Sequence, residues 1–305
     1  MPSEWIETKI PIQYGYISAK VWGMKTANSI DVVAIHGFLD NCGSFDRLIP
    51  LLNEDYYVVA IDLPGHGLSS KLPEGIPYTD PTWIIALQAV LDHFNFGELT
   101  LLGHSLGVCI ALYYASLFPN RVKTIIALDT ILPTWIKPAE IPNEMAKSYK
   151  YFNDLCTKKA TIKPNFDPSM AAKLVVAAHK MFGELTEDEA KILMQRSTQP
   201  TEDGKRVVFT KDDRLNCTLS SLPFKSHFEM VKDYYRRIKC NLLLIRGSKG
   251  LVDVTKRKIK ETVDMLEKNC ESFKSVLVKG GHFFVLTNPE EVAPIIHEFI
   301  NNLYK

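Results

Sequence analysis

Short runs of apolar residues recur along the chain, and half of them end just before a glycine or an aspartate. Runs this short and almost wholly apolar suit strands that are buried on both faces of a parallel sheet. Six segments fit this description: Val32–Ile35, Tyr57–Ile61, Leu99–Leu102, Lys123–Leu128, Asn241–Ile245 and Lys274–Val278.

Segments with helical spacing of apolar residues separate these runs. They cover Thr82–Phe94, Ser105–Phe118, Lys256–Lys268 and Glu290–Tyr304. Alternation of strands and helices predicts an α/β fold with a mostly parallel, doubly wound sheet. Right-handed crossovers then bring the carboxyl ends of the strands to one edge, where ligands bind. Before the first of these runs, Trp5–Ile12 and Tyr16–Gly23 resemble an antiparallel pair of strands.

One long segment interrupts this alternation. Between residues 133 and 223 no apolar run of the core type occurs, whereas prolines are frequent and helical patterns cover Ala171–Phe182 and Thr186–Gln195. A connection of this length is too long for a structureless loop in a compact domain. We therefore expect a core formed by residues 1–132 and 224–305, with a helical cap inserted at 133–223.

Composition and charge exclude several classes of function. The chain has 36 Lys and Arg against 35 Asp and Glu, without a basic stripe, which argues against a nucleic-acid partner. No apolar run approaches the roughly 20 residues of a transmembrane helix, and the N-terminus lacks the pattern of a secretory signal. Six scattered cysteines without a CxxC pair indicate reduced thiols. We expect a cytoplasmic protein, or one in another intracellular compartment.

The strongest chemical signal is the segment Gly103-His104-Ser105-Leu106-Gly107, which matches G-x-S-x-G. It lies between a predicted strand and a predicted helix, the context of a nucleophile elbow. The turn is so tight that small residues must flank the serine, and it places the hydroxyl near the start of a helix, where negative charge is favoured. Ser105 is therefore the predicted nucleophile.

His282 is the predicted base. It follows the last predicted strand in the glycine-rich segment Lys279–Phe283, which leads into the final helix. A histidine at this edge can accept the proton of Ser105 and later transfer it to the leaving group. His104, beside the nucleophile, is interpreted as structural because its side chain points away from Ser105 in such a turn.

Two aspartates are candidates for the acid that orients His282. Asp129 ends the strand Lys123–Leu128 at the expected edge, and it lies between the serine and the histidine, as in the chain order Ser, acid, His. Asp253 lies in the loop after the next strand and is the alternative. Asp129 is favoured, although an aspartate at a strand end also suits a turn.

The oxyanion hole of such a site is formed by two backbone N–H groups. One belongs to Leu106, the residue after the nucleophile. The other is assigned to Phe38 in the loop His36–Asp40, because Gly37 permits the backbone to turn inward after the strand Val32–Ile35.

Four segments together carry a resemblance to a known family: HGFLDN, DLPGHGLS, GHSLG and GGHFFVLTNPEEVAPIIHEFI. Over nearly its whole length the chain resembles the α/β-hydrolase superfamily. The segments FTKDDRL and IRGSKGLVD are similar to the serine hydrolase-like proteins, including the kraken type of insects. In this fold the acid usually stands where this chain has Gly250, so the usual residue is missing.

The resemblance implies a carboxylesterase-type serine hydrolase for small or medium acyl substrates, with no cofactor and no metal. It also implies that the cap covers Ser105 as a lid. Within the cap, Trp135 is the preferred wall of the substrate pocket, whereas aromatic residues such as Phe182 are interpreted as core packing. Two alternatives remain: a ligand-binding or receptor protein that retains the triad, and a non-ester hydrolase, which would usually need a carboxylate in place of Ser105.

Overall fold

The computed structural model describes residues 4–132, 138–157, 163–180, 182–217 and 228–303. Its centre is an eight-stranded sheet with the order β1-β2-β4-β3-β5-β6-β10-β11. Only the pairs β1–β2 and β2–β4 are antiparallel, and all other neighbours are parallel. The strands are β1 (Ile6–Ile12), β2 (Gly15–Trp22), β3 (Ile30–Ile35), β4 (Tyr56–Ile61), β5 (Leu99–His104), β6 (Val122–Leu128), β10 (Asn241–Lys249) and β11 (Phe273–Gly281).

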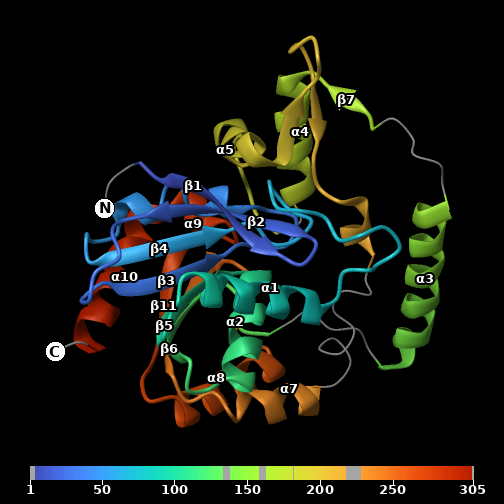
Figure 1. The fold of residues 1–305 in the computed structure, drawn as a ribbon. Coiled ribbons are helices and arrows are strands. Elements are labelled where there is room, and N and C mark those ends of the chain that lie inside the picture. Colours follow the sequence, from blue (N-terminus) through green and yellow to red (C-terminus); the bar gives the residue numbers. More distant parts are fainter. Residues whose placement is uncertain (1–3, 133–137, 158–162, 181, 218–227, 304–305) are drawn as a thin grey trace.

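Helices cover both faces of this sheet, as Figure 1 shows. The mostly parallel, doubly wound architecture predicted from the alternating pattern is confirmed. The helices of the core are α1 (Asp80–His93), α2 (Leu106–Leu117), α7 (Phe228–Tyr235), α8 (Arg257–Asn269), α9 (Phe284–Thr287) and α10 (Pro289–Leu303), with 3-10 turns η1 (Cys42–Phe45) and η2 (Ile49–Leu51).

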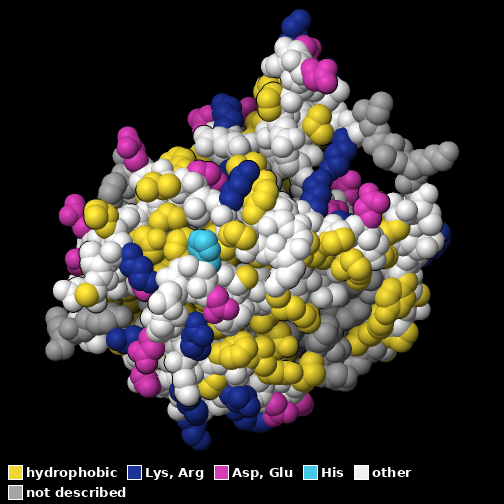
Figure 2. Space-filling view, viewed as in Figure 1, with side chains coloured by type: hydrophobic (Ala, Val, Ile, Leu, Met, Phe, Trp, Pro, Cys, Tyr) yellow, Lys and Arg dark blue, Asp and Glu magenta, His cyan; other side chains and the backbone are white. Residues whose placement is uncertain are grey.

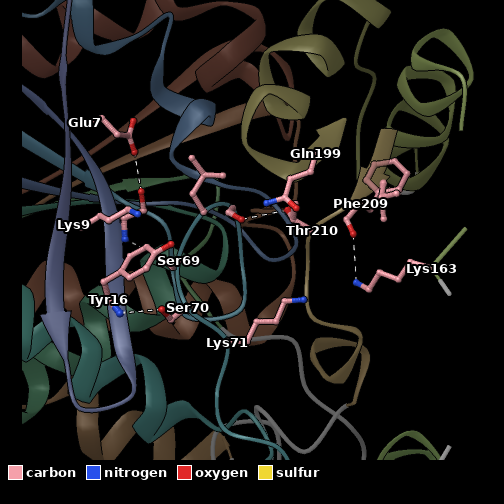
Figure 3. Close-up of a pocket in the computed structure, with 14 residues that line it drawn as sticks. Glu7, Lys9, Tyr16, Ser69, Ser70, Lys71, Lys163, Gln199, Phe209 and Thr210 are labelled. Carbon is pink, nitrogen blue, oxygen red and sulfur yellow. Dashed lines mark hydrogen bonds between the residues drawn. The ribbon is translucent and has the colours of Figure 1, made fainter. Parts of the chain in front are cut away.

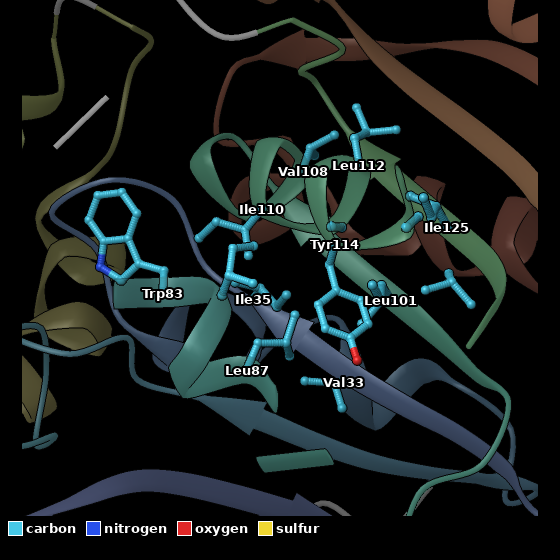
Figure 4. Packing of buried hydrophobic residues seen from close by; sticks show 14 of the residues in the cluster. Val33, Ile35, Trp83, Leu87, Leu101, Val108, Ile110, Leu112, Tyr114 and Ile125 are labelled. Atoms are coloured by element: carbon cyan, nitrogen blue, oxygen red, sulfur yellow. The ribbon is translucent and has the colours of Figure 1, made fainter. Parts of the chain in front are cut away.

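Two separate cores lie on the two faces of the sheet, which explains why the strands are apolar throughout. In β3, Val33 and Ile35 pack with α1 and α2, whereas Val32 and Ala34 face the opposite core, to which α10 contributes. Figure 4 shows the first of these cores, with Tyr114 of α2 beside the strands. Because successive side chains of a strand point to opposite faces, a strand covered on both sides needs apolar residues at every position.

The inserted segment forms a separate layer beside the sheet. It contains helices that the sequence predicts, but also a small antiparallel sheet with the order β7-β9-β8 that the sequence pattern does not predict. These strands have only two or three residues each and are partly exposed, so they leave no periodic signal. The elements are η3 (Pro138–Glu140), α3 (Ile141–Thr157), β7 (Asn165–Phe166), α4 (Pro168–His179), α5 (Glu187–Ser197), β8 (Thr198–Pro200), β9 (Val207–Phe209) and η4 (Asp213–Asn216).

A buried arginine joins the insert to the core. Arg196 in α5 donates hydrogen bonds to both carboxylate oxygens of Asp62, which follows β4, and to Glu7 of β1 at 2.8 Å. Asp62 is fully buried. Two charges removed from water are stable only when they neutralise each other, so this contact fixes α5 against the core.

The boundary where the inserted cap meets the core is called the seam. An open cavity of about 490 Å³ lies along it, between β1, β2 and the cap strands (Figure 3). Its lining includes Lys71, Lys163 and Tyr16, and it includes neither Ser105 nor His282. It is therefore separate from the predicted catalytic residues.

The surface carries mixed charges. On the face in Figure 2, basic and acidic side chains are interspersed among apolar patches. All six cysteines are free thiols. Within the described residues, the helices are too short or too polar to span a bilayer.

Candidate active site

The three predicted catalytic residues lie directly after parallel strands of one half of the sheet, β5, β6 and β11, with β10 between the last two. Ser105 follows β5, Asp129 follows β6 and His282 follows β11. His104 pairs with Leu128 in the parallel register, so the next residues of both strands are adjacent at the carboxyl edge. The Ser105 N–H donates to the Leu128 carbonyl at 3.2 Å. The sheet topology therefore places these residues at one edge.

The turn at Ser105 requires both of its glycines. Ser105 has a positive φ of 52°, a strained conformation for a residue with a side chain. A methyl group on Gly107 would overlap the carbonyl oxygen of Ile35 in β3, and one on Gly103 would overlap the backbone of α2. The glycines therefore permit the contact between β3, β5 and α2 that raises the serine to the edge of the sheet.

Asp129 is a fully buried carboxylate with three hydrogen-bond donors. Gly247 near the end of β10 and Leu251 just after β10 donate their N–H groups at 2.9 and 2.8 Å, and His282 Nδ1 lies 2.8 Å from Oδ2. Because a carboxylate only accepts, Nδ1 carries the hydrogen and Nε2 of a neutral ring is free to act as a base. Asp129 has a φ of 52°, which aspartate tolerates better than most residues.

The alternative acid does not contact His282. Asp253 is exposed, and its carboxylate accepts from the N–H and hydroxyl of Thr255 at 3.0 and 2.6 Å. A methyl group on Gly250 would overlap the Asp129 carboxylate. Of the two candidates from the sequence, the structure brings only Asp129 to His282, and the absence of a side chain at position 250 makes room for it.

His282 lies beside His104, the residue that precedes the predicted nucleophile. The rings of His104 and His282 are 4.6 Å apart, and His282 is only 2% exposed. Among the hydrogen bonds of these described residues, none joins Ser105 Oγ to His282 Nε2. Such contacts are often long without substrate and tighten in the reacting complex.

The predicted oxyanion donors flank the serine. Leu106 is the first residue of α2, and Phe38 lies in the loop after β3. Neither N–H donates a hydrogen bond to another described residue. A methyl group on Gly37 would lie 3.2 Å from Ser105 Cβ, so the glycine permits this loop to approach the serine closely. The start of α2 adds a partial positive charge.

Two buried histidines position the loops of the site. His104 Nε2 donates to the His282 carbonyl at 2.9 Å, and burial together with the nearby His282 lowers the pKa of His104 to about 4. His36 Nε2 accepts from the Leu63 N–H at 2.9 Å, and its Nδ1 donates to Gly37 O. Burial lowers the pKa of His36 as well. Both rings are therefore neutral and structural, as expected for His104.

The pocket-wall residue expected from the sequence, Trp135, lies outside the described residues. Two other aromatic residues are exposed near the site. Phe182, which the sequence pattern assigns to core packing, is 39% exposed, and its ring lies 6.1 Å from that of His282. Phe38 is 42% exposed. The sequence offers no signal that singles out Phe182, because a lone aromatic residue after a helix is usually part of a core.

The described residues contain no group of His, Cys, Asp or Glu side chains that could bind a metal ion. At the sheet edge, the His282 ring contacts the Asp129 carboxylate, and the N–H groups of Phe38 and Leu106 donate to no other described residue. Together with the Ser105 hydroxyl, these groups have the chemistry that acyl transfer needs.

Comparison with known proteins shows the family to which the chain belongs. Residues 32–289 match the model of the family described as α/β hydrolase fold. The chain is 34% identical to a probable serine hydrolase of Drosophila melanogaster, covering 97% of this chain and 88% of that protein. It is 30% identical to a serine hydrolase-like protein of Mus musculus, covering 98% and 96%.

Among solved structures, a hypothetical protein from Pseudomonas aeruginosa PAO1 superimposes with a TM-score of 0.82 at 25% identity, covering 97% of this chain and 99% of that one. The similarity thus extends over both the core and the inserted segment. The chain belongs to the α/β-hydrolase fold family, in which it groups with the serine hydrolase-like proteins.

Proposed function

We propose that the protein is a carboxylesterase that uses Ser105 as nucleophile, His282 as base and Asp129 as orienting acid. The observation that carries the proposal is the 2.8 Å contact between His282 Nδ1 and Asp129 Oδ2, at the sheet edge where Ser105 begins its turn. Asp129 fixes the ring tautomer and stabilises the imidazolium that forms when His282 accepts the serine proton.

The proposed reaction has two stages. Ser105 Oγ attacks the ester carbonyl as its proton passes to His282 Nε2, and the alcohol leaves with that proton, which gives an acyl-serine. Water then attacks the acyl-serine with His282 again as base, and the acid is released. The N–H groups of Phe38 and Leu106 would stabilise the oxyanion in both stages, since neither donates elsewhere among the described residues. No cofactor takes part.

The substrates that fit best are esters with a small or medium apolar acyl group. Phe38 and Phe182 are aromatic residues that remain partly exposed near the site. Each methylene that becomes buried against such surface contributes at most about 0.8 kcal/mol to binding. The value of kcat/KM should therefore rise several-fold as the acyl chain lengthens from acetyl to butyryl.

A series of p-nitrophenyl esters tests this proposal. Wild type should hydrolyse them, and at short times the p-nitrophenol released should show a burst if the acyl-serine accumulates. Ser105→Ala should lose about 10³-fold or more of kcat/KM, because only transition-state binding remains. Ser29→Ala provides a matched control, since it removes a hydroxyl just before β3, at the opposite edge of the sheet. Equal turnover by Ser105→Ala and wild type would contradict the proposal.

A further inference from the structure

A partly buried histidine of the cap contacts the core loop that carries Phe38. His179 is the last residue of α4, and its side chain is 13% exposed. Its Nε2 lies 2.8 Å from Asp40 Oδ1, and its Nδ1 lies 2.7 Å from the Val175 carbonyl oxygen. The Asp40 side chain is only 2% exposed. Neither residue belongs to the predicted catalytic set.

The two acceptors determine the protonation of His179. A carbonyl oxygen and a carboxylate both lack hydrogen, so both ring nitrogens of His179 must donate, and the ring is an imidazolium. Burial alone would lower the pKa of His179, but the hydrogen bond to Asp40 and the charge of Asp40 outweigh burial and raise it. A neutral ring would leave one nitrogen lone pair facing an acceptor.

The other titratable groups around Asp40 do not neutralise it. His104 Nδ1 lies 3.9 Å from Asp40 Oδ2, and His36 also interacts with this carboxylate. Burial lowers the pKa of both histidines, so that both are neutral near neutral pH. His179 is therefore the cation that pairs with Asp40 among these neighbours, and its charge is what makes the buried carboxylate stable.

Asp40 belongs to the turn that presents the Phe38 N–H. The Asp40 N–H donates to the Gly37 carbonyl at 3.2 Å, and Leu39 between them has a φ of 64°. The next residue, Asn41, donates from its side chain to the Leu193 carbonyl of α5 at 2.9 Å. Two cap helices thus contact this turn, one through a charged pair and one through an amide.

The chain after α4 also approaches the base. A methyl group on Gly183 would lie 3.1 Å from the backbone nitrogen of His282, and the ring of His179 lies 5.0 Å from that of Phe283. The end of α4 therefore contacts both the loop that carries Phe38 and the loop that carries His282. A shift of this helix end would change the positions of both.

We propose that His179 is a positioning residue, which as an imidazolium paired with Asp40 docks α4 on the core and fixes the Phe38 N–H for the oxyanion. Loss of the proton from His179 then breaks the pair and weakens stabilisation of the transition state. This inference rests on the proposed esterase function, because the Phe38 N–H matters only in a reaction that forms an oxyanion.

The pH dependence of ester hydrolysis tests the inference. The acidic limb of kcat/KM reports the base, and deprotonation of His179 adds a basic limb above the ordinary histidine pKa of about 6.5. His179→Gln should lower kcat by roughly 10-fold to 100-fold with little change in KM, and its basic limb should disappear. His93→Gln is the matched control, because His93 is an exposed histidine in the last turn of α1. Wild-type kcat and an unchanged basic limb in His179→Gln would overturn the inference.

A second measurement does not depend on activity. NMR titration of the His179 ring should give a pKa above the ordinary value in wild type, and a lower one in Asp40→Asn. A His179 ring that titrates at or below the ordinary value in wild type would also overturn the inference. Failure of the esterase proposal is distinguishable, since wild type would then hydrolyse no ester and Ser105 would not react with active-site probes. In that case the positioning role fails with it.

Discussion

The carboxyl edge of the sheet and the seam between cap and core hold their functional groups in different ways. At the sheet edge, Ser105, Asp129 and His282 are placed by strand ends and backbone N–H donors. At the seam, the contacts are pairs of charged side chains from distant segments, Arg196 with Asp62 and His179 with Asp40. Substitutions at the edge should therefore remove reacting groups directly, whereas substitutions at the seam should act on activity only indirectly, through stability, docking of the cap and pH dependence.

The largest effect is expected from the acid at the sheet edge. Asp129→Asn should lower kcat/KM by about 10³-fold to 10⁴-fold, because an amide can donate to Nδ1 and would favour the wrong tautomer of His282. Asp253→Asn should stay within about two-fold of wild type, because this exposed carboxylate accepts only from Thr255. Steady-state kinetics on one ester compare the two. A larger loss in Asp253→Asn would reverse the assignment.

At the seam, Asp62→Asn should lower the free energy of unfolding by roughly 3 kcal/mol, since it leaves the buried Arg196 with a weaker partner. Asp188→Asn is the control, because this carboxylate pairs with Lys191 on the surface of the cap. Urea unfolding provides the measurement. Similar stabilities for the two variants would show that the seam is not fixed by charge.

The charge of Asp62 at the seam should also make the stability of the protein depend on pH in acid. Burial raises the pKa of Asp62, but Arg196 outweighs burial and lowers it below the ordinary value. This stabilisation is fully present above the unfolded-state pKa of about 3.9 and is lost as the pH falls through the lower pKa of the folded state. Unfolding of wild type should therefore become easier in acid, and Asp62→Asn should show a smaller change. An identical acid dependence in both proteins would exclude this role of Asp62.

A smaller effect is expected from Gly250→Ala. The added methyl group would displace the Asp129 carboxylate and should lower kcat by roughly 10-fold to 100-fold, because small misplacements of catalytic groups reduce rate strongly. Gly97→Ala adds the same group where no atom lies within 4 Å, and it should be nearly neutral. Unchanged kcat in Gly250→Ala would mean that Asp129 does not need its present position.

The sequence predicts the sheet edge far better than the seam. Ser105 can be found because a strand-turn-helix with flanking glycines is a local pattern, and His282 because it follows the last apolar run. The acid is harder, since Asp129 and Asp253 both follow strands, and they differ only in tertiary contacts such as those of Asp129 with His282 and Gly250. The acid therefore stays open until the structure is known.

The seam depends on contacts that have no local pattern. His179 and Asp40 are 139 residues apart in the chain, and Arg196 and Asp62 are 134 apart, so neither pair can be inferred from spacing. The cap strands β7, β8 and β9 are too short for a periodic signal. Positions fixed by tertiary contacts between an insert and its core thus cannot be predicted from sequence patterns, even where the fold of the core can be.

Reaction with a fluorophosphonate probe, followed by intact mass, tests most directly whether Ser105 is an activated nucleophile. Wild type should gain the mass of one adduct, located on the peptide that contains Ser105, and Asp129→Asn should react far more slowly. Ser105→Ala should gain no adduct under the same conditions. Equal labelling of Ser105→Ala and wild type, or an adduct located on another residue, would show that Ser105 is not the nucleophile.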